Sequence, residues 1–171
     1  TQETAVAWKH ALLSQERPSA LALTRQTLKE LPKSKAQNIN INKGGYIVFE
    51  SSNKPDGIII ASGSEVSIAL QAAMELKDKD LDIRVISMPC QELYERQTAA
   101  YKNKCIPKNF DNILAVESGK GQSWFKYTGK KGSMITMESF GLSGTGNDVM
   151  RYFGFTVANI KKQMQKLIKR K

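Results

Sequence analysis

The chain has 171 residues, of which 40% are hydrophobic and 25% charged, and its formal net charge is +10. A chain of this length and composition can bury a core without disulfides or a structural metal, which excludes a disordered segment and a small disulfide scaffold. Its apolar runs are only a few residues long, so no segment is expected to span a membrane. Cys90 and Cys105 lack metal-ligand spacing and are expected to be free thiols in a reducing compartment.

The chain begins at Thr1 with neither an initiator methionine nor the basic start and apolar stretch of a signal peptide. We therefore expect a cytoplasmic protein and a piece of a longer chain. A designed fragment, proteolysis and a natural small subunit all fit this start.

The positive charge is densest at the carboxy end, from Lys161 to Lys171. This run coincides with an expected helix whose apolar positions are Val157, Ile160, Met164, Leu167 and Ile168. Cations near the carboxy end of a helix are favoured by the helix dipole. We therefore interpret the run as the solvated face of a helix rather than as a nucleic-acid or membrane arm.

The first part of the chain predicts a helix over residues 3–15, with Val6, Ala7, His10, Ala11 and Leu13 near its inner side. A short apolar strand is expected at 20–24. Residues 29–43 have no lasting periodicity and read as a linker, and Gly44-Gly45 begins a new unit.

The most informative stretch is residues 57–89, which predict a strand, a helix and a second strand. Ile58, Ile59 and Ile60 form an apolar run typical of a strand covered on both faces. Ser62 and Glu65 have the spacing of a capping box at the start of the helix. Two strands joined through a helix are expected to be parallel, with a right-handed crossover.

Further elements complete an α/β pattern. They are a strand at 46–49, a helix at 92–102, a strand at 113–116, a short aromatic helix at 123–127, a strand at 134–137, a turn of helix at 148–152 and a final helix from about residue 156. These elements predict a three-layer α/β/α fold around a five-stranded, mostly parallel sheet. The strand at 46–49, joined by a short turn to the next, is expected to be antiparallel to its neighbour.

Several segments, in this order and at these separations, resemble the carboxy-terminal part of transketolase. They are Glu3–Lys9, Ala20–Gln26, Ile59–Val66, Arg84–Pro89, Val116–Gly119, Trp124–Gly129, Ser139–Gly141 and Phe153–Val157. The resemblance covers nearly the whole chain, and no single segment carries it.

The resemblance implies that residues 1–42 are the tail of the middle, pyrimidine-binding domain followed by the interdomain linker, and that residues 43–171 are the complete third domain. Transketolases transfer a two-carbon ketol unit between phosphorylated sugars, as homodimers that use thiamine diphosphate and a divalent metal, magnesium or calcium. In the family, the residues that hold the metal and the diphosphate lie upstream. The resemblance therefore implies that this fragment supports assembly, binds no cofactor and is inactive alone.

Arg25 is the one candidate site residue. In the family, the arginine of a Ser/Thr-Arg-Gln motif at the end of this strand contacts the substrate phosphate, and Thr24-Arg25-Gln26 matches the motif. A planar guanidinium can hold phosphate oxygens bidentately, although a strand-capping arginine is the simpler reading without the family.

Other residues are set aside as structural. His10, the single histidine, lies on a helix without a partner at ligand spacing, and the two cysteines lack a catalytic framework. Two glycine-rich loops, at 117–123 and 141–146, precede expected helices and could hold an anion, but neither is a nucleotide-binding motif. We interpret both as tight turns, and Gly144-Thr145-Gly146 departs from the Ala-Pro sequence usual in transketolases.

Two alternative functions remain. One is the same domain of another thiamine diphosphate enzyme, such as deoxyxylulose phosphate synthase or the β chain of a 2-oxo acid dehydrogenase. The other is a basic nucleic-acid-binding module, whose binding would depend steeply on salt. The Thr24–Gln26 motif and the segment Arg84–Pro89 favour transketolase.

Overall fold

A five-stranded mixed sheet organises the fold. The computed structural model describes residues 2–24, 26–28 and 41–169. The strands are β1 (Tyr46–Phe49), β2 (Gly57–Ala61), β3 (Ile83–Ser87), β4 (Ile113–Glu117) and β5 (Ser133–Thr136), in the spatial order β1-β3-β2-β4-β5. All neighbouring pairs are parallel except β1–β3. The predicted five-stranded, mostly parallel sheet is thereby confirmed.

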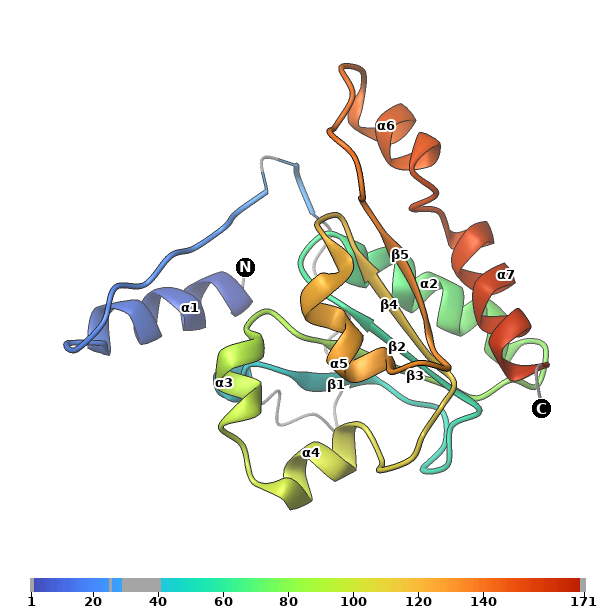
Figure 1. The fold of residues 1–171 in the computed structure, drawn as a ribbon, viewed down its shortest axis with the longest axis horizontal. Helices are drawn as coiled ribbons and strands as arrows, with labels where there is room; N and C mark the ends of the chain where they lie inside the picture. Colours follow the sequence, from blue (N-terminus) through green and yellow to red (C-terminus); the bar gives the residue numbers. More distant parts are fainter. Residues whose placement is uncertain (1, 25, 29–40, 170–171) are drawn as a thin grey trace.

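Helices cover both faces of the sheet (Figure 1). One layer consists of α2 (Glu65–Lys77) and α7 (Val157–Ile168), and the other of α3 (Gln91–Glu95), α4 (Ala99–Cys105), the 3-10 helix η2 (Gly121–Trp124) and α5 (Phe125–Thr128). Two further helices lie outside these layers: α1 (Gln2–Leu13) and α6 (Gly146–Tyr152). A 3-10 turn, η1 (Ile41–Lys43), leads into β1.

The strand β2 shows why the sequence folds this way. Its side chains alternate, so that Ile59 packs with α2 and α7 while Ile58 and Ile60 pack beneath the other layer. All three isoleucines are fully buried, as the uninterrupted apolar run predicts for a central parallel strand. The terminal helix α7 likewise buries Ile160, Met164 and Leu167 and leaves its lysine-rich face outward.

The orientation predicted for β1 is right, but the partner is not the expected one. A short connection suggested that β1 would lie beside β2, yet β1 pairs with β3, and Tyr46 lies opposite Ser87. β3 occupies the position beside β2 because the right-handed crossover through α2 places it there. The connection from β1 to β2 therefore passes over the end of β3.

The helix predicted at 92–102 is two helices. α3 ends at Glu95 and α4 begins at Ala99, with Thr98 between them as the N-cap. The Thr98 hydroxyl oxygen accepts a hydrogen bond from the Tyr101 backbone N–H, at 3.3 Å. A side chain that caps a helix in this way starts a new helix rather than continuing the old one.

The capping box predicted for α2 is wrong. Ser64, not Ser62, is the N-cap residue, and its side chain makes no capping hydrogen bond. The Ser62 hydroxyl donates instead to the Glu117 carboxylate at the end of β4, and the Glu65 carboxylate accepts from Ser64. Tertiary contacts between adjacent strand ends have replaced the local motif.

The strand predicted at 20–24 is not formed in the structure, where no hydrogen-bonded ladder includes these residues. A strand exists only beside another strand, and the described part of the chain offers residues 20–24 no such neighbour. The linker predicted at 29–43 lies outside the described residues except for η1, where Ile41 is buried.

Arg84 on β3 is a buried cation that the sequence did not reveal. Its side chain is 5% exposed and donates to the Glu50 carboxylate at 2.9 Å and to the backbone carbonyls of Lys104 and Cys105 at 2.9 and 3.0 Å. The guanidinium thus ties the end of β1 to the end of α4 beneath the sheet. Buried charges persist when they are paired and fully hydrogen-bonded, as here.

We expect Arg84→Met to destabilise the chain by about 3 kcal/mol, because it leaves a carboxylate and two inward carbonyls without their donor. The matched control is Arg151→Met on α6. Arg151 is largely exposed and approaches Asp148 only to 3.9 Å, so a change below about 0.5 kcal/mol is expected. Urea unfolding of both variants measures the difference, and equal stability of the two would contradict the structural role of Arg84.

Candidate functional site

Arg25, the predicted phosphate-binding residue, lies outside the described residues, so its role stays a prediction. Its neighbours Thr24 and Gln26 are described, and both are exposed. The Gln26 backbone N–H donates to the Thr24 hydroxyl oxygen at 3.3 Å, the pattern of a turn closed by a threonine side chain. The two residues that flank Arg25 therefore form a local turn on an open surface.

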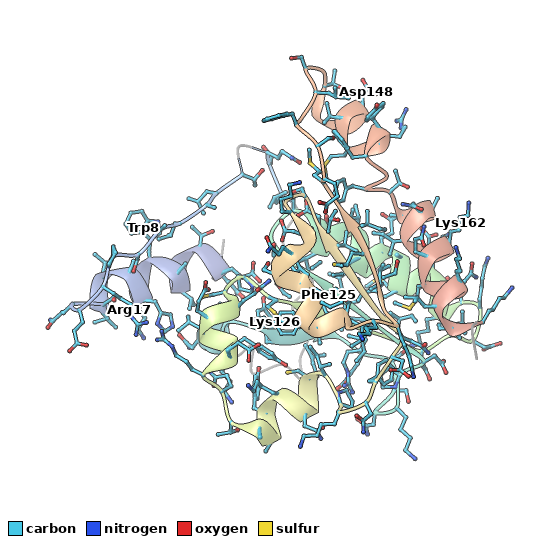
Figure 2. The ribbon with its side chains drawn as sticks, in the orientation of Figure 1. Trp8, Arg17, Phe125, Lys126, Asp148 and Lys162 are labelled. Atoms are coloured by element: carbon cyan, nitrogen blue, oxygen red, sulfur yellow. The ribbon has the colours of Figure 1, made fainter. Side chains whose placement is uncertain are left out.

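The motif belongs to an arm, which we define as residues 2–28 apart from Arg25. Figure 1 shows α1 and the chain after it lying to one side of the sheet. No residue of α1 is buried, and five large apolar side chains of the arm are exposed: Trp8 (54%), Leu12 (77%), Leu13 (69%), Leu23 (59%) and Leu28 (41%). Trp8 and Arg17 mark the arm in Figure 2.

The predicted inner side of α1 is correct for Val6, Ala7, His10 and Ala11, which are half-buried, but wrong for Leu13. Leu13 ends the helix and faces solvent. The His10 Nε2 atom is shielded from solvent without a hydrogen-bond partner among the described residues. The structural interpretation of His10 therefore stays a prediction.

One polar contact fastens the arm to the sheet. The Glu3 carboxylate, in the first turn of α1, accepts hydrogen bonds from the Tyr46 hydroxyl (2.7 Å) and from the Ser87 hydroxyl. Tyr46 is 4% exposed and Ser87 is fully buried. Burial, and then the Glu3 charge, raises the pKa of the Tyr46 phenol, which keeps it protonated as a donor. Sequence reasoning missed this contact because 43 and 84 residues separate the partners.

A second polar cluster lies where the strand order reverses, at the carboxyl ends of β2 and β4. Ser62 donates to the Glu117 carboxylate and Ser64 to the Glu65 carboxylate, each at 2.7 Å. Burial raises the pKa of Glu65, and the nearby Glu117 charge adds to this effect. Ligands of open α/β sheets often bind at such a reversal. Here Ser62 and Ser64 donate to the chain's own carboxylates, so the cluster joins the two strand ends.

The glycine loop at 117–123 contacts the carboxylate of Glu138, an anionic group of the same chain. Glu138 accepts hydrogen bonds from the Gly121 backbone N–H (3.3 Å) and the Thr136 hydroxyl (3.0 Å), and Lys120 lies 3.4 Å from its carboxylate. The Thr136 hydroxyl, followed by the Gly121 N–H, lowers the pKa of Glu138. The loop is therefore a closed turn, as interpreted, beside a shallow hollow lined by Lys120, Gly121, Gln122, Phe125, Met134 and Glu138.

The loop at 141–146 is also a turn that starts a helix. The Thr145 hydroxyl oxygen accepts from the Asp148 backbone N–H at 3.4 Å and so caps α6. Residues 139–148 are exposed throughout, and Phe140 is almost fully so. Asp148 marks this outer position of α6 in Figure 2.

The described residues do not fit a divalent metal or a metal-bound diphosphate. Within residues 2–24, 26–28 and 41–169, no group of three or more histidine, cysteine, aspartate or glutamate side chains is placed to hold a metal ion. A divalent ion that binds a diphosphate needs such oxygen ligands. Cys90 and Cys105 are free thiols, and none of the described helices is long and apolar enough to cross a membrane.

Comparison with known proteins places this fold among transketolases. The family profile described as "Transketolase-like TK C-terminal domain" matches residues 44–156. The chain is 39% identical to the transketolase of Bacillus subtilis over 168 residues, and 40% identical to transketolase 1 of Vibrio vulnificus over 166 residues. Each alignment covers 97% of this chain and 25% of the relative, so the chain spans about a quarter of these proteins.

Solved structures show the same relationship in three dimensions. The chain superposes on transketolase from Leishmania mexicana with a TM-score of 0.87 at 34% identity, covering 98% of this chain and 24% of that one. A transketolase of Pichia stipitis in complex with sedoheptulose 7-phosphate gives a TM-score of 0.87 at 33% identity, with the same coverage. Because the family profile matches most of the chain and the fold agrees, this chain belongs to the family of transketolase-like C-terminal domains.

Proposed function

We propose that this chain is the carboxy-terminal portion of a transketolase, an enzyme that transfers a two-carbon ketol unit between phosphorylated sugars. The observation that carries the proposal is the extent of the similarity. The alignments with transketolases cover 97% of the chain, whereas the family profile covers residues 44–156 alone. The similarity to transketolases therefore includes the arm, with its Thr24–Gln26 motif, as well as the sheet domain.

In the complete enzyme, residues 1–42 form the tail of the pyrimidine-binding domain and the linker, and residues 43–171 form the third domain. Upstream domains cover the exposed apolar side chains of the arm, since a soluble protein rarely leaves such a patch open. The enzyme is a cytoplasmic homodimer, and segments outside this chain hold thiamine diphosphate and magnesium or calcium. This portion supports assembly and supplies Arg25.

Arg25 holds the substrate phosphate in this proposal. A guanidinium keeps its charge at every relevant pH and can donate two parallel hydrogen bonds to phosphate oxygens. The similarity to a transketolase whose structure contains sedoheptulose 7-phosphate supports a phosphorylated sugar as the ligand. The exposure of Thr24 and Gln26 supports a binding role for this motif.

The domain boundary gives a direct prediction. We expect limited proteolysis of the chain to cut first between Lys33 and Gly44, and to leave a folded piece that starts near Gly44. Gly44 has a φ of +76°, and a Cβ there would lie 2.3 Å from the Cys90 carbonyl oxygen, so the backbone at Gly44 is packed against the start of α3. Mass spectrometry identifies the cut, and primary cleavage within residues 57–89 would contradict the boundary.

A hybrid enzyme tests the proposed function. In Bacillus subtilis transketolase, the matching segment of about a quarter of the chain is replaced by the present chain, whose identity is 39%. We expect the hybrid to transfer ketol units from a phosphorylated ketose to a phosphorylated aldose. A second hybrid built on Vibrio vulnificus transketolase 1 controls for failure of one host to fold. Two folded hybrids without transfer would exclude the proposal.

A further inference from the structure

An exposed apolar segment joins the end of β5 to α6. Its large side chains are open to solvent: Phe140 is 98% exposed, Leu142 51% and Tyr152 73%. Residues 139–147 include no charged side chain, although 25% of the whole chain is charged. The centres of protein interfaces are depleted of charge and enriched in aromatic residues. The composition of this segment is therefore that of an interface centre rather than of a solvated loop.

The described part of the chain leaves this segment open. Residues 138–148 are all exposed, and no residue of α6 is buried. A Cβ built on Gly141 or on Gly146 would have free space within 4 Å, apart from its neighbours along the chain. Apolar side chains that stay open in this way mark interaction sites.

The base of the segment is nevertheless fixed to the domain. Met150 and Phe153, at the inner end of α6, pack against the buried core that α2 and α7 cover. The Phe155 backbone N–H donates to the Met150 carbonyl at 2.8 Å. A surface that is held in one conformation loses little entropy on binding. The segment is therefore a prepared surface, attached at one end and open at the other.

The upstream part of a transketolase is the occupant that fits this surface. The chain covers 25% of its transketolase relatives, so about three-quarters of a complete enzyme is available to cover it. Figure 1 shows α6 and the end of the arm beyond the same edge of the sheet. In the proposed function the arm is the tail of an upstream domain, and its large apolar side chains are exposed as well. One neighbouring body can therefore cover both surfaces.

We propose that residues 139–152 are a docking surface for the upstream part of the same transketolase chain, with Phe140 as the anchor that enters an apolar pocket there. The docking rests on the proposed function, because a complete transketolase supplies the occupant. Glu138 and Asp148 flank the uncharged stretch and give it a charged rim. An aromatic anchor within a polar rim is the usual anatomy of an interface.

Photo-crosslinking of the complete enzyme, or of the hybrid, tests the docking. Phe140→p-benzoylphenylalanine is expected to link to a peptide of the upstream part, in a product that keeps the mass of one subunit. The same replacement at Lys162, which is exposed on α7 (Figure 2), is the control and should give no link. A product of twice that mass would place the second subunit over Phe140 and overturn the proposal.

A pair of serine substitutions tests the docking without a photoreactive group. Phe140→Ser with Leu142→Ser should change the unfolding equilibrium constant of the isolated chain less than about twofold, because both side chains are exposed there. Amide exchange in α6 should be at least about tenfold slower in the hybrid than in the isolated chain, and the two substitutions should abolish this difference. Lys162→Ser should change neither quantity.

The results separate the docking from the proposed function. Equally fast exchange of α6 in the isolated chain and in a folded, unsubstituted hybrid would overturn the docking, whatever the activity of the hybrid. A hybrid with protected α6 that transfers no ketol unit would fault the proposed function and leave the docking surface standing.

Discussion

Arg25→Ala in the complete enzyme, or in the hybrid, is expected to raise KM for phosphorylated sugars roughly 10- to 100-fold. Loss of a charge-assisted hydrogen bond to phosphate costs about 1.5–3 kcal/mol, and the whole of this loss falls on substrate binding when the group contacts only the phosphate. Arg25→Lys keeps the charge but loses the planar fork, so an intermediate KM is expected. Steady-state kinetics with a phosphorylated ketose and aldose measure the change.

Arg17→Ala is the matched control for this prediction. Arg17 is an exposed arginine of the same arm (Figure 2), so its removal tests whether charge alone near the substrate explains the effect. We expect KM within about twofold of the parent for this variant, as for most exposed substitutions. The affinity for thiamine diphosphate should stay unchanged in both variants. Weakened cofactor binding with a normal KM in Arg25→Ala would contradict the phosphate assignment.

The chain alone is expected to show no ketol transfer and no binding of thiamine diphosphate, the largest effect that the proposal predicts. The described residues hold no group of side chains placed to bind a metal ion, which a metal-bound diphosphate requires. The Nε2 atom of His10 has no hydrogen-bond partner among those residues.

Isothermal titration of the chain with thiamine diphosphate and magnesium measures the first part of this expectation. No saturable heat should appear at ligand concentrations of about 1 mM, the range in which a free energy of binding of about −4 kcal/mol would be detected. The hybrid serves as the positive control under the same conditions. Turnover by a preparation that mass spectrometry shows to be free of longer enzyme would contradict this prediction.

Local sequence patterns predicted the centre of the fold. Ile58–Ile60 and the stripe of α2 are apolar at the periods of a buried strand and a helix, and burial follows those periods. The terminal helix was predicted from local patterns in the same way. Thr156 caps α7, and three apolar positions of α7 are buried. These features depend on neighbours within a few residues, so the sequence contains the information directly.

Contacts between distant residues could not be predicted. Ser62 bonds to Glu117 instead of capping α2, since the carboxyl ends of β2 and β4 meet only in the folded sheet. The pairing of β1 with β3 depends on the crossover through α2, and the network of Arg84 depends on that pairing. Residues 20–24 have the sequence pattern of a strand but form none, because the described part of the chain contains no partner strand for them.

The residues of the candidate site also differ in how far the sequence alone could reveal their roles. Arg25 came from resemblance of an ordered set of segments, because a single arginine carries no functional signal by itself. Glu3 lies within one of those segments, but its role depends on Tyr46 and Ser87, which only the pairing of β1 with β3 brings together. A carboxylate in the first turn of a helix is ordinarily explained by the helix dipole, so no local pattern distinguished it.

The rate of ketol transfer by the hybrid enzyme tests the central claim most directly. It is measured beside the chain alone and beside Bacillus subtilis transketolase that lacks the matching segment, with phosphorylated ketose and aldose as substrates. The account predicts transfer well above the blank for the hybrid and none for either part alone. A hybrid that folds, dimerises and binds thiamine diphosphate but transfers no ketol unit would contradict the assignment of this chain to a transketolase.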